Sequence, residues 1–313
     1  MNLIFFGTQD WAAKLLEHLI KDGFFKIVGI VTQPDKPVGR KQEFSASPVK
    51  EVAVRHGINV LQPQKLTDKA FLSELKSLEP QIALVIAYGR ILPQQILDTA
   101  PLGFINVHPS LLPLWRGPSP IQTAIAAGNT ASGVTIMKID EQMDHGPILV
   151  QAEIPLEKNE TPQTFLSKVV DVSGRLFVKT LKDYVNGTIK PKEQDHKHAS
   201  ICKMLTREDG QIDWNETDKV IEQKIRAYQP WPGTWTSLRY NERTLRLKIL
   251  RAQTSHVESV RAIGTLFSSD DRLLVGAKNS LLEITSLQPE GKAPMPAKAF
   301  LSGYAHLLGS QLG

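Results

Sequence analysis

The sequence predicts an α/β protein in which an open sheet flanked by helices is followed by a small β-barrel. Two features of the first part indicate the open sheet. Short apolar runs alternate with helical stretches, and some of these stretches begin with N-terminal signals such as Ser47-Pro48. A third feature indicates the barrel, because beyond about residue 205 the pattern changes to short alternating strands joined by polar turns.

Length and composition limit the class of protein. A chain of 313 residues with a hydrophobic fraction of 41% suits two domains, each with its own core. Cys202 is the only cysteine, which excludes an intrachain disulfide and a multi-cysteine metal site and favours a reducing cytosol. The N-terminus is predicted to be a first strand rather than a signal peptide, and no apolar run approaches the roughly 18 residues that a membrane span needs. The formal net charge of +5 permits a polyanionic partner without requiring one.

The chain opens with a β-α-β unit. Leu3 to Phe6 is an apolar strand, Asp10 is expected to cap a helix that runs to about Lys21, and Lys26 to Val31 is the second strand. The turn Gly7-Thr8-Gln9-Asp10 lacks the second and third glycines of a dinucleotide fingerprint. We therefore expect no NAD-type site.

The other elements of the first part follow from apolar runs and helix caps. Ser47-Pro48 predicts an N-cap followed by a first-turn proline. The loop from Gln33 to Ser47 carries Arg40 and Lys41 and is too long and too basic for a plain connection. We expect these two charges to be solvated, unless the second domain gives an independent reason for a polyanionic partner. The predicted helices span residues 48 to about 57, 68–78, 120–128 and 161–184, with a short one from Pro93, and the predicted strands span 59–61, 82–87, 104–108, 133–139 and 148–154.

A polar stretch from Asn186 to Ser200 is predicted to be a linker, with a domain boundary near residue 205. We therefore expect a first domain over residues 1–188, a linker over 189–205 and a second domain over 206–313. In the second domain a helix from Glu216 to Ala227 precedes strands at residues 234–239, 245–252, 264–267, 273–277 and 280–287. Such strands predict a small β-barrel of the oligonucleotide-binding type.

A basic strand face marks this second domain. Arg246 and Lys248 are two residues apart on one predicted strand, so their side chains share a face. A basic strand face on a small barrel fits a nucleic-acid surface.

The stretch from Phe104 to Gly117 carries the clearest chemical signal. It opens with an apolar run, and because side chains alternate along a strand, Asn106 and His108 point to the same face. Pro109 and Pro113 end the strand where these side chains emerge. In an open α/β sheet the carboxyl ends of the strands are where ligands bind.

These two side chains suit acyl transfer. An amide donor such as Asn106 is the group needed where an oxyanion forms. Asp144, on a later polar loop, would reach His108 if the two strands are neighbours, and a carboxylate beside an imidazole orients it and favours its charged form. The trio predicts attack on an acyl carbon through a tetrahedral intermediate without a metal. An isolated Asn-x-His at a strand end is also found as a satisfied turn, so the residues alone leave both interpretations open.

The other histidines give weaker signals. His196 and His198 lie in a charged stretch, which we expect to be solvated rather than metal-binding. His145 is expected to be an ordinary loop side chain.

Several motifs together resemble one enzyme family. Phe104 to Gly117, with Ser-Leu-Leu-Pro followed by Arg-Gly, resembles the formyltetrahydrofolate-dependent formyltransferases, as do Val85 to Pro93 and Asp144 to Ile148. The resemblance implies a Rossmann-like first domain, 10-formyltetrahydrofolate as the formyl donor, and a catalytic trio. The residues that it implies are Asn106, His108 and Asp144 for catalysis, Ser110, Leu111, Leu112 and Pro113 bordering the folate, and Arg90, Ile91, Leu92 and Asp140 as further walls of the pterin pocket.

The second domain resembles that of family members that formylate an aminoacyl-tRNA. The similar segments are Leu205 to Trp214, Ile225 to Thr234 and Leu287 to Lys292. The resemblance implies a cytoplasmic enzyme of translation initiation that acts on initiator methionyl-tRNA, as a monomer and without a metal or NAD.

The loop with Arg40 and Lys41 resembles a basic insertion that reaches the acceptor end of the tRNA in this family. Here Gln42 and Glu43 follow, so the loop departs from its most basic versions and its affinity for phosphate is expected to be lower.

Two alternatives stay open at this point. A formyltransferase that acts on an amino-sugar nucleotide or another small amine would share Asn106, His108 and Asp144, although the second domain argues against the glycinamide ribonucleotide enzyme, which resembles the first domain alone. A non-catalytic RNA-binding protein would keep the fold, but the intact trio argues against it.

Overall fold

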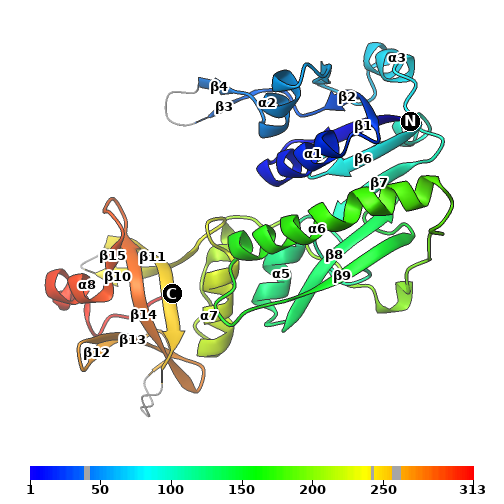
Figure 1. The fold of residues 1–313 in the computed structure, drawn as a ribbon. Coiled ribbons are helices and arrows are strands. Elements are labelled where there is room, and N and C mark those ends of the chain that lie inside the picture. The colour runs from blue at the N-terminus through cyan, green and yellow to red at the C-terminus, as the bar shows by residue number, and fades with distance from the viewer. Residues whose placement is uncertain (39–42, 241–242, 256–261) are drawn as a thin grey trace. The chain divides into compact units, whose positions relative to one another are not determined.

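The chain divides into two structural units in the computed structural model (Figure 1), which describes all residues except 39–42, 241–242 and 256–261. The first unit comprises Met1–Gly117, Ala131–Pro155 and Leu166–Cys202, and the second comprises Pro118–Thr130, Leu156–Phe165 and Lys203–Gly313. Residues of the expected linker as far as Cys202 thus pack with the first unit. The domain limits at residues 188 and 205 stay a prediction.

Among the described residues, a seven-stranded sheet forms the centre of the first unit, in the order β5-β2-β1-β6-β7-β8-β9. Neighbouring strands from β5 to β7 are parallel, whereas β8 runs antiparallel to β7 and to β9. The strands are β1 (Asn2–Gly7), β2 (Lys26–Val31), β5 (Val60–Leu61), β6 (Ile82–Ile86), β7 (Phe104–His108), β8 (Ala131–Lys138) and β9 (Ile148–Pro155).

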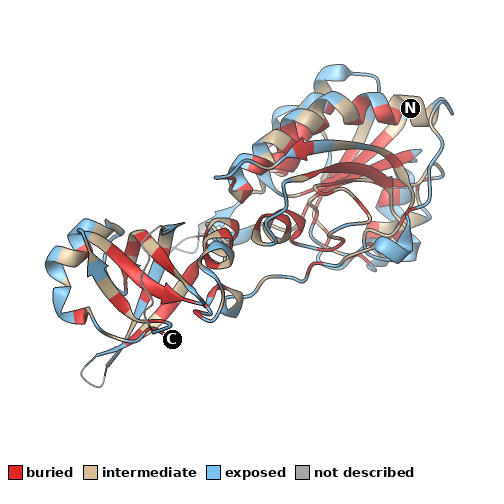
Figure 2. Ribbon diagram, turned by 90° about the horizontal axis from the view of Figure 1, so that it is seen from below, coloured by how far each residue is buried: buried red, intermediate tan, exposed pale blue. Residues whose placement is uncertain are grey.

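Helices cover both faces of this sheet. On one face, alternate strand residues pack with α3 and α4, and the shared cluster includes Ile4, Phe6, Ala83, Val85, Phe71, Leu75 and Ile96. On the other face lie α1 and α6, which Figure 1 shows side by side and which are joined by Lys182 and Asp22 at 2.8 Å. The helices are α1 (Asp10–Asp22), α2 (Pro48–Arg55), α3 (Lys69–Ser77), α4 (Gln94–Leu97) and α6 (Pro162–Val185), and the 3₁₀ turn η1 is His196–His198. Figure 2 shows buried residues concentrated along the strands.

The helix caps test two of the predictions. The Ser47 hydroxyl accepts a hydrogen bond from Lys50 N at 3.1 Å, which confirms the predicted cap of α2. The predicted cap at Asp10 is wrong, because Gln9 is the N-cap of α1 and Asp10 is its first helical residue. Its carboxylate still lies in the first turn, where the helix dipole favours negative charge.

The sheet of the second unit is antiparallel and curled, in the order β10-β11-β14-β13-β12, with β15 beside β14. Residues at the C-terminal end join its two edges, since Leu312 bridges to Leu238 in β10 and Gln311 bridges to Thr265 before β12. The strands are β10 (Thr234–Tyr240), β11 (Arg243–Thr254), β12 (Leu266–Ser269), β13 (Arg272–Ala277), β14 (Ser280–Pro289) and β15 (Met295–Pro296). A mixed α/β first part and a barrel-like second part confirm the predicted fold class.

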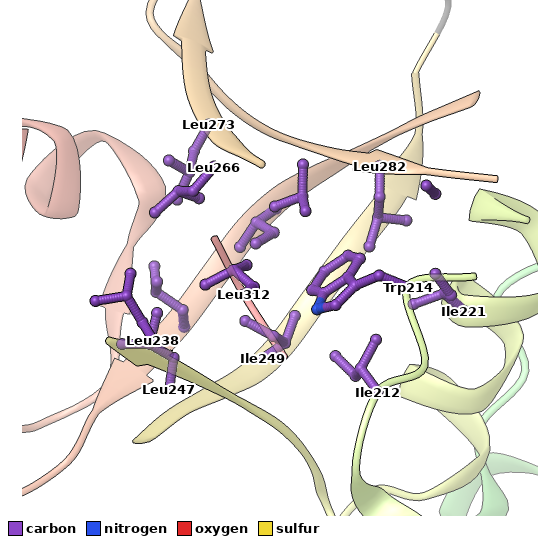
Figure 3. Close-up of a cluster of buried hydrophobic side chains, with 14 of the residues drawn as sticks. Ile212, Trp214, Ile221, Leu238, Leu247, Ile249, Leu266, Leu273, Leu282 and Leu312 are labelled. Carbon is purple, nitrogen blue, oxygen red and sulfur yellow. The ribbon is translucent and has the colours of Figure 1, made fainter. Parts of the chain in front are cut away.

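The core of the second unit lies between this half-barrel and α7. Trp214 sits at its centre in Figure 3, among Ile221 of α7 and strand residues such as Ile249 and Leu282, and its indole Nε1 donates to Thr236 Oγ1 at 3.0 Å. The helical elements of the unit are α5 (Pro120–Ala126), which packs on α7, α7 (Asp218–Ala227), α8 (Ala297–Gly303), and the 3₁₀ turns η2 (Glu208–Gly210) and η3 (Ala305–Leu307).

Two segments differ from the sequence prediction. The expected loop from Gln33 to Ser47 contains an antiparallel pair, β3 (Lys36–Val38) and β4 (Glu43–Ser45), whose pattern is hidden by prolines and charges. The helix α8 was not predicted, because Phe300 is its single buried residue and gives no periodic signal. Among the described residues, we find no helix with the length and apolar character needed to cross a membrane.

Adjacent residues of β11 provide a test of the second core. Leu247 is fully buried and Lys248 points outward. We expect Leu247→Ala to lower the free energy of unfolding by about 2–5 kcal/mol, and Lys248→Ala to change it by less than about 0.5 kcal/mol. Urea unfolding followed by tryptophan fluorescence measures both, and equal effects would contradict the assignment of this face as core.

Candidate active site

The central strand β7 presents Asn106 and His108 at its carboxyl end. Asn106 lies opposite Val85 of the parallel strand β6 and Met137 of the antiparallel strand β8, and His108 lies opposite Thr135. Asn106 is half-buried, and only 4% of His108 is exposed. The predicted placement of both residues at a strand end is confirmed.

The turn that follows β7 is held by hydroxyl groups. Ser110 Oγ donates to Leu114 O at 2.6 Å, and Thr135 Oγ1 donates to Ser110 O at 2.6 Å. Thr135 Oγ1 also accepts from Leu112 N at 3.1 Å and from Gln151 Nε2 at 2.9 Å. The peptide bond from Leu112 to Pro113 is cis. These contacts return the chain across the end of β7, so that Trp115 and Gly117 lie beside the strand.

Asp144 lies on the loop between β8 and β9 and contacts both side chains of β7. Its Oδ2 is 3.5 Å from His108 Nδ1, and its Oδ1 accepts from Asn106 Nδ2 at 3.4 Å. Gly117 N donates to Oδ2 at 2.8 Å, which is the shortest of these contacts. Asp144 therefore reaches His108, as predicted. The antiparallel strand β8 ends beside the start of β7, with Lys138 opposite Ile105, and the loop runs back from there to His108.

Both ring nitrogens of His108 face acceptors. Nε2 lies 3.1 Å from Trp115 O, and a carbonyl oxygen can only accept a hydrogen bond. Nδ1 faces the Asp144 carboxylate. Each ring nitrogen of His108 therefore lies beside an oxygen atom that can accept a hydrogen bond from it.

The residues predicted to border the folate lie in three places. Ser110, Leu111, Leu112 and Pro113 belong to the turn after β7. Asp140 lies on the same loop as Asp144, and its Oδ2 is 2.7 Å from His145 Nδ1.

The third place is the chain after the neighbouring strand β6. Here the Arg90 guanidinium donates to the carbonyl oxygens of Pro63 and Gln64 at 3.0 and 3.1 Å. Ile91 is 74% exposed and Leu92 is buried. Within the described part of the chain no hydrogen bond or ion pair joins these residues to the trio, and their role as pocket walls stays a prediction.

Tyr88 precedes this turn and is buried in the core of the first unit. Burial raises the pKa of its hydroxyl to about 12, so the group stays protonated at neutral pH. Among the described residues that hydroxyl has no hydrogen-bond partner.

The residues predicted to bind tRNA are placed only in part. Arg40 and Lys41 lie outside the described residues. Arg246 and Lys248 are exposed on the outer face of β11, and the Arg246 guanidinium lies 4.0 Å from the centroid of the Trp235 ring. The predicted shared face is thus confirmed, and a half-buried aromatic ring lies beside it.

A group of side chains that contacts the Asp144 loop could not be found from the sequence. Gln194, predicted to be linker, is buried and donates to the carbonyl oxygens of Asp144 and Gly146. His196, which was expected to be solvated, is exposed but stacks on His145 with ring centroids 4.0 Å apart. No periodicity or motif connects residues this far apart in the chain, and only the fold brings them together.

Comparison with known proteins gives the family. A family model described as formyl transferase matches residues 1–181, and one described as formyl transferase, C-terminal domain, matches residues 204–305. Methionyl-tRNA formyltransferases of Roseiflexus sp. (strain RS-1) and Chloroflexus aurantiacus are each 41% identical to this chain. These alignments cover 100% and 97% of this chain and 95% and 97% of the relatives. The chain belongs to the methionyl-tRNA formyltransferase family. The family predicted from the motifs is therefore confirmed.

Solved structures of formyltransferases share the fold. An N-formyltransferase from Helicobacter canadensis, in complex with folinic acid and dTDP-3-aminofucose, has a TM-score of 0.67 and 21% identity and covers 90% of this chain and 97% of its own. Phosphoribosylglycinamide formyltransferase from Bacillus halodurans has a TM-score of 0.52 and 24% identity and covers 60% of this chain and 97% of its own. At such identities the similarity shows the fold alone.

The hydroxyl of Thr135 gives a test of the turn after β7. Thr135→Val removes the buried hydroxyl that pairs with Ser110 O and Leu112 N. We expect this loss to lower the free energy of unfolding of the first unit by about 1–3 kcal/mol. Thr135→Ser retains the hydroxyl and is expected to lose less. Thermal or urea unfolding measures both variants, and a serine variant as unstable as the valine variant would argue against the hydroxyl.

Proposed function

We propose that this protein transfers the formyl group of 10-formyltetrahydrofolate to the free α-amino group of methionyl-tRNA, the initiator form, for translation initiation. The observation that carries the proposal is the contact of Asp144 with both Asn106 and His108 at the carboxyl end of β7. Membership of the methionyl-tRNA formyltransferase family along the full chain supports the choice of acceptor.

The proposed reaction needs a nucleophilic amine and a place for negative charge. The α-amino nitrogen attacks the formyl carbon, and the formyl oxygen becomes an oxyanion in the tetrahedral intermediate. Asn106 Nδ2 donates to this oxygen, and His108 Nε2 exchanges its acceptor Trp115 O for the same oxygen, as amide and imidazolium donors do in other acyl transfers. Asp144 holds the imidazole in its charged form and fixes its ring plane.

The intermediate then collapses by breaking the bond from the formyl carbon to N10. N10 leaves with a proton, which His108 helps to move, and the attacking amine loses its own proton. The products are tetrahydrofolate and formylmethionyl-tRNA, so atoms and charges balance. No covalent enzyme intermediate is formed.

The proposed acceptor is an RNA, and the outer face of β11 has suitable chemistry. Arg246 and Lys248 supply positive charge for phosphates, and Trp235 supplies a ring on which a base can stack. Arg40 and Lys41 are proposed to contact the acceptor end. We also propose that the protein acts as a monomer in the cytoplasm. Its co-substrate 10-formyltetrahydrofolate is proposed to be bordered by Ser110 to Pro113 and by Arg90, Ile91, Leu92 and Asp140.

Removing the amide donor tests the function. We expect Asn106→Ala to slow formylation of methionyl-tRNA by about 10²–10³-fold, since one such donor contributes about 3 to 4 kcal/mol to transition-state stabilisation. His108→Ala is expected to fall at least as far, with tRNA binding nearly unchanged in both variants. Gln142→Ala, an exposed residue of the Asp144 loop, is the control and should match the parent. Near-parental turnover in both site variants would rule out the assigned roles.

Salt dependence tests the RNA surface. We expect Lys248→Ala and Arg40→Ala each to raise KM for methionyl-tRNA and to lower the slope of log KM against log salt by about one, because each contact with a phosphate releases a counterion. Lys76→Ala, an exposed lysine of α3, should leave the slope unchanged. If the Lys248 and Arg40 variants show parental slopes, these side chains are simply solvated.

A further inference from the structure

Gln194 holds the loop that carries Asp144 through two hydrogen bonds to the loop backbone. The Gln194 Nε2 group donates to Asp144 O at 2.9 Å and to Gly146 O at 2.7 Å. Gln194 itself is buried, with 5% of its surface exposed. Asp144 has φ +50°, a left-handed conformation that a non-glycine residue keeps only when its surroundings hold it.

Arg116 determines which way the Gln194 amide points. Its Nε and NH2 groups donate to Gln194 Oε1 at 3.1 and 2.7 Å, and a guanidinium has no acceptor. The amide oxygen must therefore face Arg116, which leaves both N–H groups for the two carbonyl oxygens. Arg116 is 9% exposed, and its NH2 also lies 2.8 Å from His196 Nδ1, so the guanidinium is itself held in place.

Two consecutive residues, Arg116 and Gly117, thus help to hold the backbone and the carboxylate of Asp144. Arg116 acts on the backbone through Gln194, and the next residue, Gly117, donates directly to Asp144 Oδ2 at 2.8 Å. The contacts from the carboxylate to Asn106 and His108 are longer, at 3.4 and 3.5 Å, so a small movement of the loop would break them.

We propose that Gln194, oriented by Arg116, is a positioning residue for formyl transfer that acts by holding Asp144 against His108. The inference rests on the proposed function. A displacement of about 1 Å at a group that orients a catalytic side chain can cost about 10²-fold in rate. None of the residues proposed to contact the tRNA lies on the Asp144 loop, so we expect the effect to fall on kcat rather than on KM for methionyl-tRNA.

Gln194→Glu is the most informative variant. It keeps the shape of the side chain and an acceptor for Arg116, but its carboxylate cannot donate to the two carbonyl oxygens. We expect kcat to fall by about 10–100-fold in Gln194→Glu and Gln194→Ala, with KM for methionyl-tRNA within about twofold of the parent. His198→Ala is the control, because His198 is an exposed residue of the same segment whose contact is with Asp195.

A double-mutant cycle with Asp144→Ala separates positioning from general support of the fold. If Gln194 acts through Asp144, Gln194→Glu causes no further loss of kcat once Asp144 is alanine. The inference is overturned by parental kcat in Gln194→Glu, by a loss confined to KM, or by the same fold loss with and without Asp144. An inactive parent chain would instead overturn the proposed function itself, which distinguishes the two failures.

Discussion

A single carboxylate organises the candidate active site. Asp144 contacts the Asn106 amide, the His108 imidazole and the Gly117 backbone N–H, so one side chain links the end of β7 to the turn that follows it. A half-buried carboxylate is stable only with such partners. Its Oδ2 lies beside one ring nitrogen of His108, whose other nitrogen lies 3.1 Å from Trp115 O. The proposed donors for an oxyanion and the carboxylate that contacts them are therefore parts of one network.

Sheet topology makes this network possible. The parallel strands bring the carboxyl end of β7 to the edge where α/β sheets bind ligands. The next strand, β8, runs antiparallel to β7, and its register places Thr135 opposite His108. Thr135 then supports the turn after β7, while the loop after β8 delivers Asp144. Strand β8 thus supplies the support, and the loop that leaves it beside the start of β7 runs back to bring Asp144 to the end of β7.

The sequence predicted the parts of this account that depend on local pattern or on a motif. Alternation along Phe104 to His108 placed Asn106 and His108 on one face, and the Ser47 cap followed from its residue type. Asp10 was misplaced by one position, because a cap is decided by where the chain leaves the strand and not by the residue alone. The placement of Gln194 beside the site could not be predicted, since it depends on hydrogen bonds with Arg116 and Asp144 that only the folded chain creates. Tertiary hydrogen bonds of this kind have no periodic signature in sequence.

The most direct test of the central claim is transfer of a labelled formyl group. The parent chain is incubated with 10-formyltetrahydrofolate labelled at the formyl carbon and with equal concentrations of initiator methionyl-tRNA, an amino-sugar nucleotide and glycinamide ribonucleotide. We expect the label to appear as N-formylmethionine after the tRNA ester is hydrolysed, and we expect Asn106→Ala and His108→Ala to suppress it. Label on the sugar nucleotide or the ribonucleotide, or on no acceptor, would contradict the account.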